Sequence, residues 1–257
     1  MTTTTTNRIG VLKLWLLNFV ANAAVLAVWY LWLTIPDAHG WQVAGSVLIA
    51  LIVVVSVLWL RAGTLAWFRV EKFRGQRCIW PAYRHAWRHV LALGIWVLVF
   101  VVLAWILWGV YSYVPQFAIW FRQKLGGGPS PRNVMRDVIW LLLLIGVFVL
   151  PGLWVPTATT ISAVGFSADH IVLSRRVWKR AIYWLWFCLL VGASVYIPYK
   201  LVWWIPDLQT LRQQTWSVAG RFLLAYIIAI TGFIAVVWMT ALHTDREDPI
   251  SILAADH

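Results

Sequence analysis

The sequence predicts an all-α protein, a polytopic transmembrane helical bundle with six spans arranged as three parallel helical hairpins, with amphipathic helices at the membrane interface. Three observations predict this class. Of the 257 residues, 62% are hydrophobic and only 12% are charged, about half the charged share of a typical soluble domain. Apolar runs long enough to cross a bilayer recur along the chain. The basic residues gather at the ends of these runs with many of the 21 tryptophans, as is typical of membrane–water interfaces.

The apolar runs divide the chain into three parts. A disordered N-terminus is expected over 1–10, a single six-helix transmembrane domain over 11–242, and a polar tail over 243–257. Within the domain the expected spans cover, in order, 14–35, 41–60, 90–113, 138–157, 181–205 and 216–242.

Prolines are expected to interrupt two of these runs. Pro115 should break the third run and leave an amphipathic piece from Gln116 to Lys124. Pro151 and Pro156 should kink or end the fourth helix.

A basic, tryptophan-rich segment from 61 to 89 sets the expected orientation. Placed on a helix, its residues Trp80, Tyr83 and Trp87 form one stripe with Leu91, the pattern of a helix that lies in the interface. If both termini lie on the cytoplasmic side of the membrane, the segments on that side hold about two thirds of the Lys and Arg. We therefore expect a multi-pass protein of a bacterial-type inner membrane whose N- and C-termini are cytoplasmic.

The net charge of +12 indicates the expected partner. In a soluble protein it would suit nucleic acid, but here the cations adjoin apolar runs, so anionic lipid headgroups are the nearer partner and nucleic acid is not expected. A membrane protein partner or a second copy of the chain remains an alternative partner. The residues expected to bind headgroups are Arg74, Arg77, Arg84, Arg88, Arg175, Arg176, Lys179 and Arg180.

The chain also resembles itself. Residues 113–120 align without a gap with 196–203, and 41–52 align with 216–227. These matches favour a helical hairpin used three times in one orientation, although a composition rich in Trp, Val, Ala and Leu makes chance matches easier. The layout resembles that of bacterial multi-pass membrane domains such as those fused to glycerophosphodiester phosphodiesterases, with 75–88 and 165–180 as the amphipathic segments. We carry no function over from this resemblance.

Two groups of residues could suggest a metal site or a catalytic site. Cys78, His85 and His89 lack a carboxylate nearby and have arginines beside them, so we expect no metal there. Asp169 and His170 lack a positioned nucleophile. We therefore expect neither catalytic activity nor a cofactor.

Two functions remain. The leading hypothesis is an accessory or scaffold subunit, or a lipid-interacting membrane protein, that acts through its Arg/Trp-rich cytoplasmic segments. The alternative is a small-molecule or lipid transporter. The predicted runs hold no Asp, Glu, Lys or Arg near their middle, which weighs against ion-driven transport. Polar contacts within the membrane would come from Asn18, Asn22, Ser194, Tyr226 and Thr231.

Overall fold

The structure is a computed structural model that describes residues 8–34, 39–125, 130–166, 177–207 and 210–245. Across these ranges every regular element is a helix, and six helices are long and apolar enough to cross a membrane. The predicted all-α class and the six apolar spans are therefore confirmed.

The long helices overlap the predicted spans but differ from them at several ends. The first helix begins at Arg8 instead of position 14, so residues 8–10 belong to it rather than to the expected disordered N-terminus, and the last begins at Leu211 instead of position 216. The second span continues to Arg69 instead of ending at Leu60, and the fourth runs from Pro131 to Val164 instead of over 138–157. In chain order the long elements are α1 (Arg8–Trp32), α2 (Gly40–Arg69), α5 (Val90–Ser112), the continuous α7 (Pro131–Leu144), η1 (Ile145–Val149) and α8 (Leu150–Val164), then α10 (Ala181–Trp203) and α11 (Leu211–Asp245).

Prolines act differently in the third and fourth spans. The chain breaks at Tyr113, between α5 and α6 (Val114–Leu125), as the position of Pro115 predicts. In the fourth span the helix continues through Pro151 and Pro156. The π-helical turn η1 directly precedes Pro151, and such a turn gives room to the proline ring, which would clash with the carbonyl four residues earlier.

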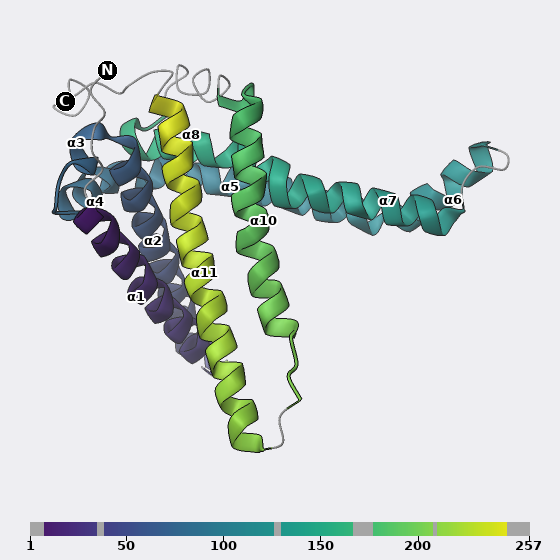
Figure 1. Ribbon diagram of the computed structural model, residues 1–257, viewed down its shortest axis with the longest axis horizontal. Helices are drawn as coiled ribbons and strands as arrows, with labels where there is room; N and C mark the ends of the chain where they lie inside the picture. Colours follow the sequence, from purple (N-terminus) through teal and green to yellow (C-terminus); the bar gives the residue numbers. More distant parts are fainter. Residues whose placement is uncertain (1–7, 35–38, 126–129, 167–176, 208–209, 246–257) are drawn as a thin grey trace.

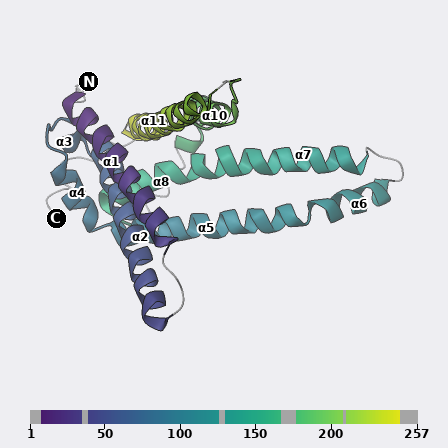
Figure 2. The same cartoon turned by 90° about the horizontal axis from the view of Figure 1, so that it is seen from below.

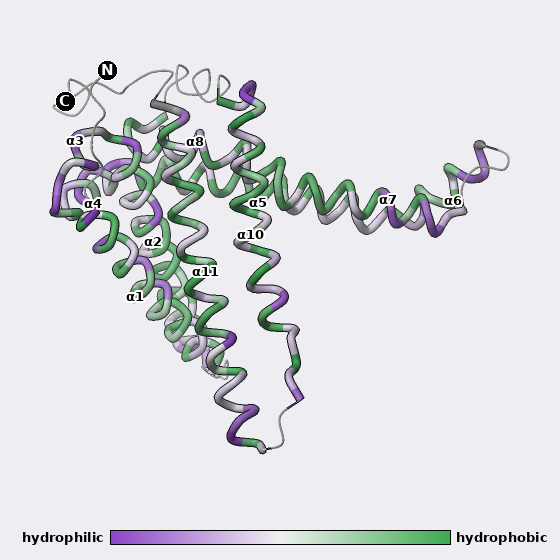
Figure 3. The backbone as a smooth tube through the Cα atoms, viewed as in Figure 1, coloured by the Kyte–Doolittle hydropathy of each residue, from purple (hydrophilic) through white to green (hydrophobic). Residues whose placement is uncertain are grey.

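The long helices diverge from one end of the molecule as three arms (Figures 1 and 2). One arm is α1 with α2, one is α5 and α6 with α7, and one is α10 with α11. In Figure 1 the middle arm points to the right, whereas the other two run downward. The middle arm thus departs from the side-by-side bundle that the sequence predicts. Figure 3 shows that its long helices are mostly hydrophobic, with hydrophilic residues near its tip.

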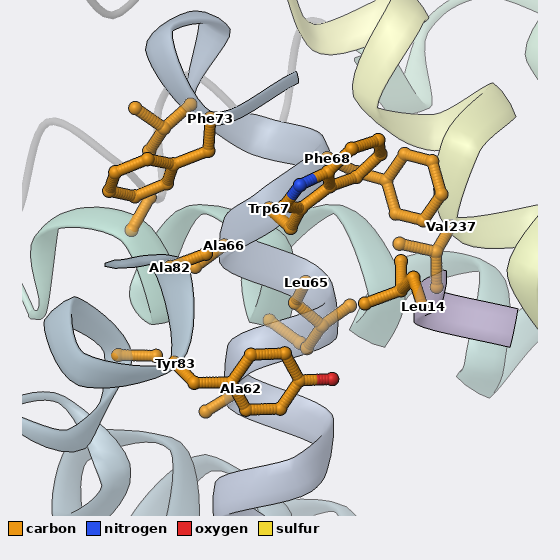
Figure 4. Packing of buried hydrophobic residues seen from close by; sticks show 14 of the residues in the cluster. Leu14, Ala62, Leu65, Ala66, Trp67, Phe68, Phe73, Ala82, Tyr83 and Val237 are labelled. Carbon is orange, nitrogen blue, oxygen red and sulfur yellow. The ribbon is translucent and has the colours of Figure 1, made fainter. Parts of the chain in front are cut away.

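The C-terminal half of α2 lies where the arms meet, in a region that we call the hub. Apart from Arg61, the residues from Leu60 to Val70 are buried. Trp67 is fully buried there, and Figure 4 shows it beside Phe68, with Leu14 of α1 and Val237 of α11 close by. The same core also includes Leu93 of α5 and Ile161 of α8, so the hub is the hydrophobic core at which the arms are joined.

A short helix, α4 (Trp80–Trp87), covers one side of the hub, after the single turn of α3 (Glu71–Arg74). Its residues Ala82, Tyr83 and Ala86 are buried against α2. A glycine permits this close approach, because a Cβ on Gly63 would lie 2.3 Å from the Tyr83 ring. The α4 helix is therefore fixed to α2 by its apolar face, which leaves its polar face outward.

The middle arm is joined to the hub near its base. Trp96 of α5 donates its indole N–H to the carbonyl of Trp154 in α8, and Trp154 donates in return to the carbonyl of Trp96, both at 3.3 Å. Farther out, α5 exposes large apolar side chains such as Leu98, Val102 and Trp105. Exposed apolar residues of this kind face lipid in a bilayer.

In the third arm, α10 and α11 approach closely at one point. A Cβ on Gly232 of α11 would lie 1.8 Å from Oγ and 2.6 Å from Cβ of Ser194 in α10. Ser194 donates its hydroxyl hydrogen to the carbonyl of Leu190 at 2.6 Å, within its own helix. The contact is therefore one of small residues that lets two backbones meet.

We expect Gly232→Ala to destabilise the third arm by roughly 1–3 kcal/mol, because the added methyl forces the helices apart. Gly220→Ala, on the same helix, is the matched control, because nothing lies within 4 Å of its Cβ position. The apparent Tm in detergent measures the effect. A second change, Ser194→Gly, should restore much of the loss. Equal Tm values for the two glycine variants would contradict this contact.

Candidate functional site

The α4 helix carries the first candidate site on its outward face. Trp80 and Trp87 are 59% and 56% exposed. Together with Tyr83 they surround the Trp59 ring of α2 at centroid distances of 5.7 to 5.9 Å. Trp59 also donates its indole N–H to the carbonyl of Tyr83 at 2.9 Å. The predicted aromatic stripe therefore exists and is anchored on α2, although Leu91 belongs to the next helix, α5.

Beside the stripe, a shallow hollow of about 420 Å³ presents two arginines. Arg84 and Arg88 are exposed, and neither forms an ion pair with another described residue. The other lining residues are Phe73, Pro81, His85 and Trp87. Two open guanidinium groups beside aromatic rings form a surface that suits a phosphate or another anion. We call this the arginine hollow.

The other residues predicted to bind headgroups lie in different environments. Arg77 and Lys179 are exposed, and Arg180 is half-buried. Arg74 is only 7% exposed, so its side chain offers little surface to a headgroup. Arg175 and Arg176 lie outside the described residues, as do Asp169 and His170.

Two histidines of the same region contact the end of α8 rather than a common ligand. His85 Nε2 lies 2.6 Å from the carbonyl oxygen of Ala163, one of the carbonyls that the end of a helix leaves unpaired. The His89 ring is 5.3 Å from the His85 ring and adjoins Gly165, whose φ of +80° suits glycine. Cys78 is exposed and free. Among the described residues, no group of three or more His, Cys, Asp or Glu is placed to hold a metal ion.

The second candidate site lies inside the junction of α1, α2 and α11. Tyr226 of α11 donates its hydroxyl hydrogen to the carbonyl of Phe19 in α1 at 2.5 Å. Trp15 of α1 donates its indole N–H to Thr231 Oγ1 in α11 at 3.1 Å. Four of the five polar residues predicted to make contacts within the membrane thus meet at this junction; these are Asn18, Asn22, Tyr226 and Thr231. The fifth, Ser194, belongs to the contact of α10 with α11.

Arg61 is the centre of this junction, which the sequence did not predict. Its Nη2 donates to Asn22 Oδ1 at 2.8 Å and its Nη1 to Asn18 Oδ1 at 3.4 Å. The guanidinium carbon lies 4.3 Å from the centroid of the Phe233 ring, a cation–π contact. The helix α2 carries this arginine within its length and continues past Leu60, the expected end of the second span.

A buried hydrogen-bond chain joins the junction to α4. Fully buried Asn18 donates to Thr64 Oγ1 at 3.0 Å, and Thr64 donates to the carbonyl of Leu60 at 2.8 Å. The hydroxyl of Tyr83 lies 3.0 Å from Thr64 Oγ1 and must be the donor, since the one hydroxyl hydrogen of Thr64 is used. The threonine oxygen then has both lone pairs occupied.

An apolar groove of about 550 Å³ runs between α1 and α2. Its lining is almost entirely apolar, with Val25 and Val53 as examples, and Trp59, Trp80 and Tyr83 close one end. None of the five polar residues predicted within the membrane lines it. The groove therefore suits hydrocarbon rather than a polar cargo.

Comparison with models of protein families, with curated proteins and with solved structures finds no match to this chain. Its candidate sites are accordingly defined by their geometry and chemistry.

The environment of His89 predicts a pH dependence. Burial, with the neighbouring charges of His85 and Arg88, lowers the pKa of His89. The fold thus favours the neutral ring, whereas the unfolded chain titrates near the ordinary pKa of about 6.5. This contribution to stability is present above that pH and is lost as the pH falls through the lower folded-state pKa.

We therefore expect the apparent Tm in detergent to fall when the buffer changes from about pH 7.5 to about pH 5.5. The fall should be smaller in His89→Gln, which removes the titrating group. An identical fall in the wild type and the variant would show that His89 does not carry the effect.

Proposed function

We propose that this chain is a non-catalytic, multi-pass protein of a bacterial-type inner membrane. It acts as an accessory or scaffold subunit and holds anionic lipid headgroups on its α4 surface. Six helices within the described residues are long and apolar enough to cross a membrane, which supports a multi-pass protein.

The observation that carries the lipid role is the arginine hollow. Arg84 and Arg88 project from a helix whose aromatic side chains Trp80 and Trp87 are also exposed. Tryptophan favours the headgroup level of a bilayer, and cations near an anionic membrane surface each contribute about 1 kcal/mol of attraction. The same helix thus offers apolar anchors and unpaired positive charge at one depth.

The proposed orientation places this surface in the cytoplasmic leaflet, with both termini on that side. The first turn of α1 and the last turns of α11 border one hollow, which Arg8 and Trp238 help to line. This supports a common side for the two ends, and the concentration of Lys and Arg near α4 favours the cytoplasm as that side under the positive-inside rule.

We also propose that the three arms are copies of one hairpin unit and that α4 and α6 lie in the interface. The sequence matches of 113–120 with 196–203 support the repeat. Each arm starts from the hub region and returns to it (Figures 1 and 2), as a repeated hairpin would. Arg122 and Lys124 near the end of α6 suit a helix that ends among headgroups.

The middle arm supports the scaffold role. It extends away from the other two arms and exposes bulky residues on both of its long helices, such as Trp105 on α5 and Trp140 on α7. We propose that a membrane protein partner or a second copy of the chain packs there. The apolar lining of the α1–α2 groove supports this role over the transport of a polar small molecule.

Removing the charges of the arginine hollow tests the proposal. In nanodiscs of mixed anionic and zwitterionic lipid, Arg84→Gln with Arg88→Gln should lower the preference of the protein for spin-labelled anionic lipid by up to about thirtyfold, because about 1 kcal/mol is lost for each of the two cations. Added salt should lower the wild-type preference similarly.

The matched control is Arg84→Lys with Arg88→Lys, which keeps both charges and should keep most of the preference. If the glutamine variant selects anionic lipid as strongly as the wild type does, the α4 surface is not the lipid site.

A further inference from the structure

Arg61 carries a positive charge for which the described residues supply no anion. A guanidinium has five N–H donors, and the side-chain acceptors that contact it are two neutral amide oxygens, those of Asn18 and Asn22. No described carboxylate lies within ion-pair distance of it. An ionised side chain within a membrane span is costly unless it is paired, so such groups mark functional sites.

The guanidinium is held in place but is not closed off. Phe233 covers one face of it, and the amide oxygens of Asn18 and Asn22 fix two of its nitrogens. Arg61 and Asn22 are nevertheless only half-buried, whereas Asn18 beside them is fully buried. A half-buried arginine whose guanidinium is oriented and keeps spare donors suits a phosphate, which accepts two parallel hydrogen bonds from arginine.

The depth of Arg61 brings it within reach of lipid phosphates. The helix α2 continues for eight residues beyond it, or about 12 Å. Through Asn18 and Thr64 it is connected by hydrogen bonds to Tyr83 of α4. Its neighbours along α2, Trp59 and Thr64, both contact α4. If α4 lies among the headgroups, as proposed above, Arg61 lies at that level, where phospholipids carry their phosphates.

We propose that Arg61, oriented by Asn18 and Asn22, binds the phosphate of one phospholipid that enters the junction of α1, α2 and α11. The inference rests on the proposed lipid role and adds a specific, single-lipid site to a surface that attracts many headgroups. The bound lipid would neutralise the charge of Arg61 and would strengthen the junction of α1 and α11 with α2.

The test is native mass spectrometry of protein that has been washed in neutral detergent, followed by titration with a diacyl phospholipid. The wild type should retain one phospholipid per chain. Arg61→Gln should weaken that binding at least about tenfold, because charge-assisted hydrogen bonds are lost. Equal retention by the wild type and Arg61→Gln would overturn the proposal.

A second variant keeps the arginine and guards against misfolding. Asn22→Asp places a carboxylate where an oxygen already accepts from Nη2 at 2.8 Å, so an internal ion pair should replace the phosphate. The variant also loses the hydrogen bond from Asn22 Nδ2 to the carbonyl of Asn18, which the ion pair should offset. We therefore expect an apparent Tm close to that of the wild type and loss of the retained lipid. Retention of the lipid at the wild-type level would contradict the proposal.

Two further comparisons separate this site from the rest. Arg84→Gln with Arg88→Gln should keep the retained lipid. The two proposals are thereby tested separately, because this variant removes only the arginine hollow and Arg61→Gln removes only the Arg61 site. Inorganic phosphate alone should stabilise the wild type less than the phospholipid does. Equal stabilisation by inorganic phosphate and by the phospholipid would assign the site to free phosphate and contradict the proposal that it binds a lipid.

Discussion

The contact on which the arrangement depends is the Arg61 guanidinium held between α1 and α11. In hydrocarbon, apolar helices gain little by leaving lipid for one another, so polar groups and close small-residue contacts decide which helices stay together. Asn18 and Asn22 bring α1 to Arg61 by hydrogen bonds, and Phe233 brings α11 by its ring. An apolar residue at position 61 would remove the hydrogen bonds to α1 and the cation–π contact with α11 that hold the three helices together at this point.

The same rule accounts for the divergence of the arms. The third arm has its Ser194–Gly232 contact, and the middle arm has the reciprocal bonds of Trp96 and Trp154 at its base. Beyond that base α5 is almost wholly apolar, and its Ser112 bonds to a carbonyl of its own helix. Lacking polar contacts to other helices there, the middle arm can extend from the hub (Figure 1).

Much of the fold could be predicted from the sequence, because the length and hydropathy of the runs are local properties. The break before Pro115 and the outward position of Arg84 and Arg88 are of this kind. The role of Arg61 could not be predicted, because a charged residue that follows an apolar run normally marks the end of a span, although the apolar and small residues of 62–68 continue the helical pattern. The spacing of Asn18 and Asn22 showed a polar face, but its partner depends on tertiary packing.

The burial of Arg74 and the separation of the middle arm also depend on tertiary contacts. The sequence of a basic segment does not tell whether a given arginine is exposed or buried, because only the packing of α3 and α4 on α2 decides this. Likewise, an all-apolar helix such as α5 carries no pattern that tells which of its faces meets a neighbour.

The most direct test of the central contact is a double-mutant cycle between Arg61→Met and Asn22→Ala, with the free energy of unfolding measured in mixed micelles. If the guanidinium and the amide hold α1 to α2, the two changes will be non-additive, with a coupling of about 1 kcal/mol. Additivity within about 0.3 kcal/mol would contradict the account, because it would mean that the two side chains contribute to stability independently.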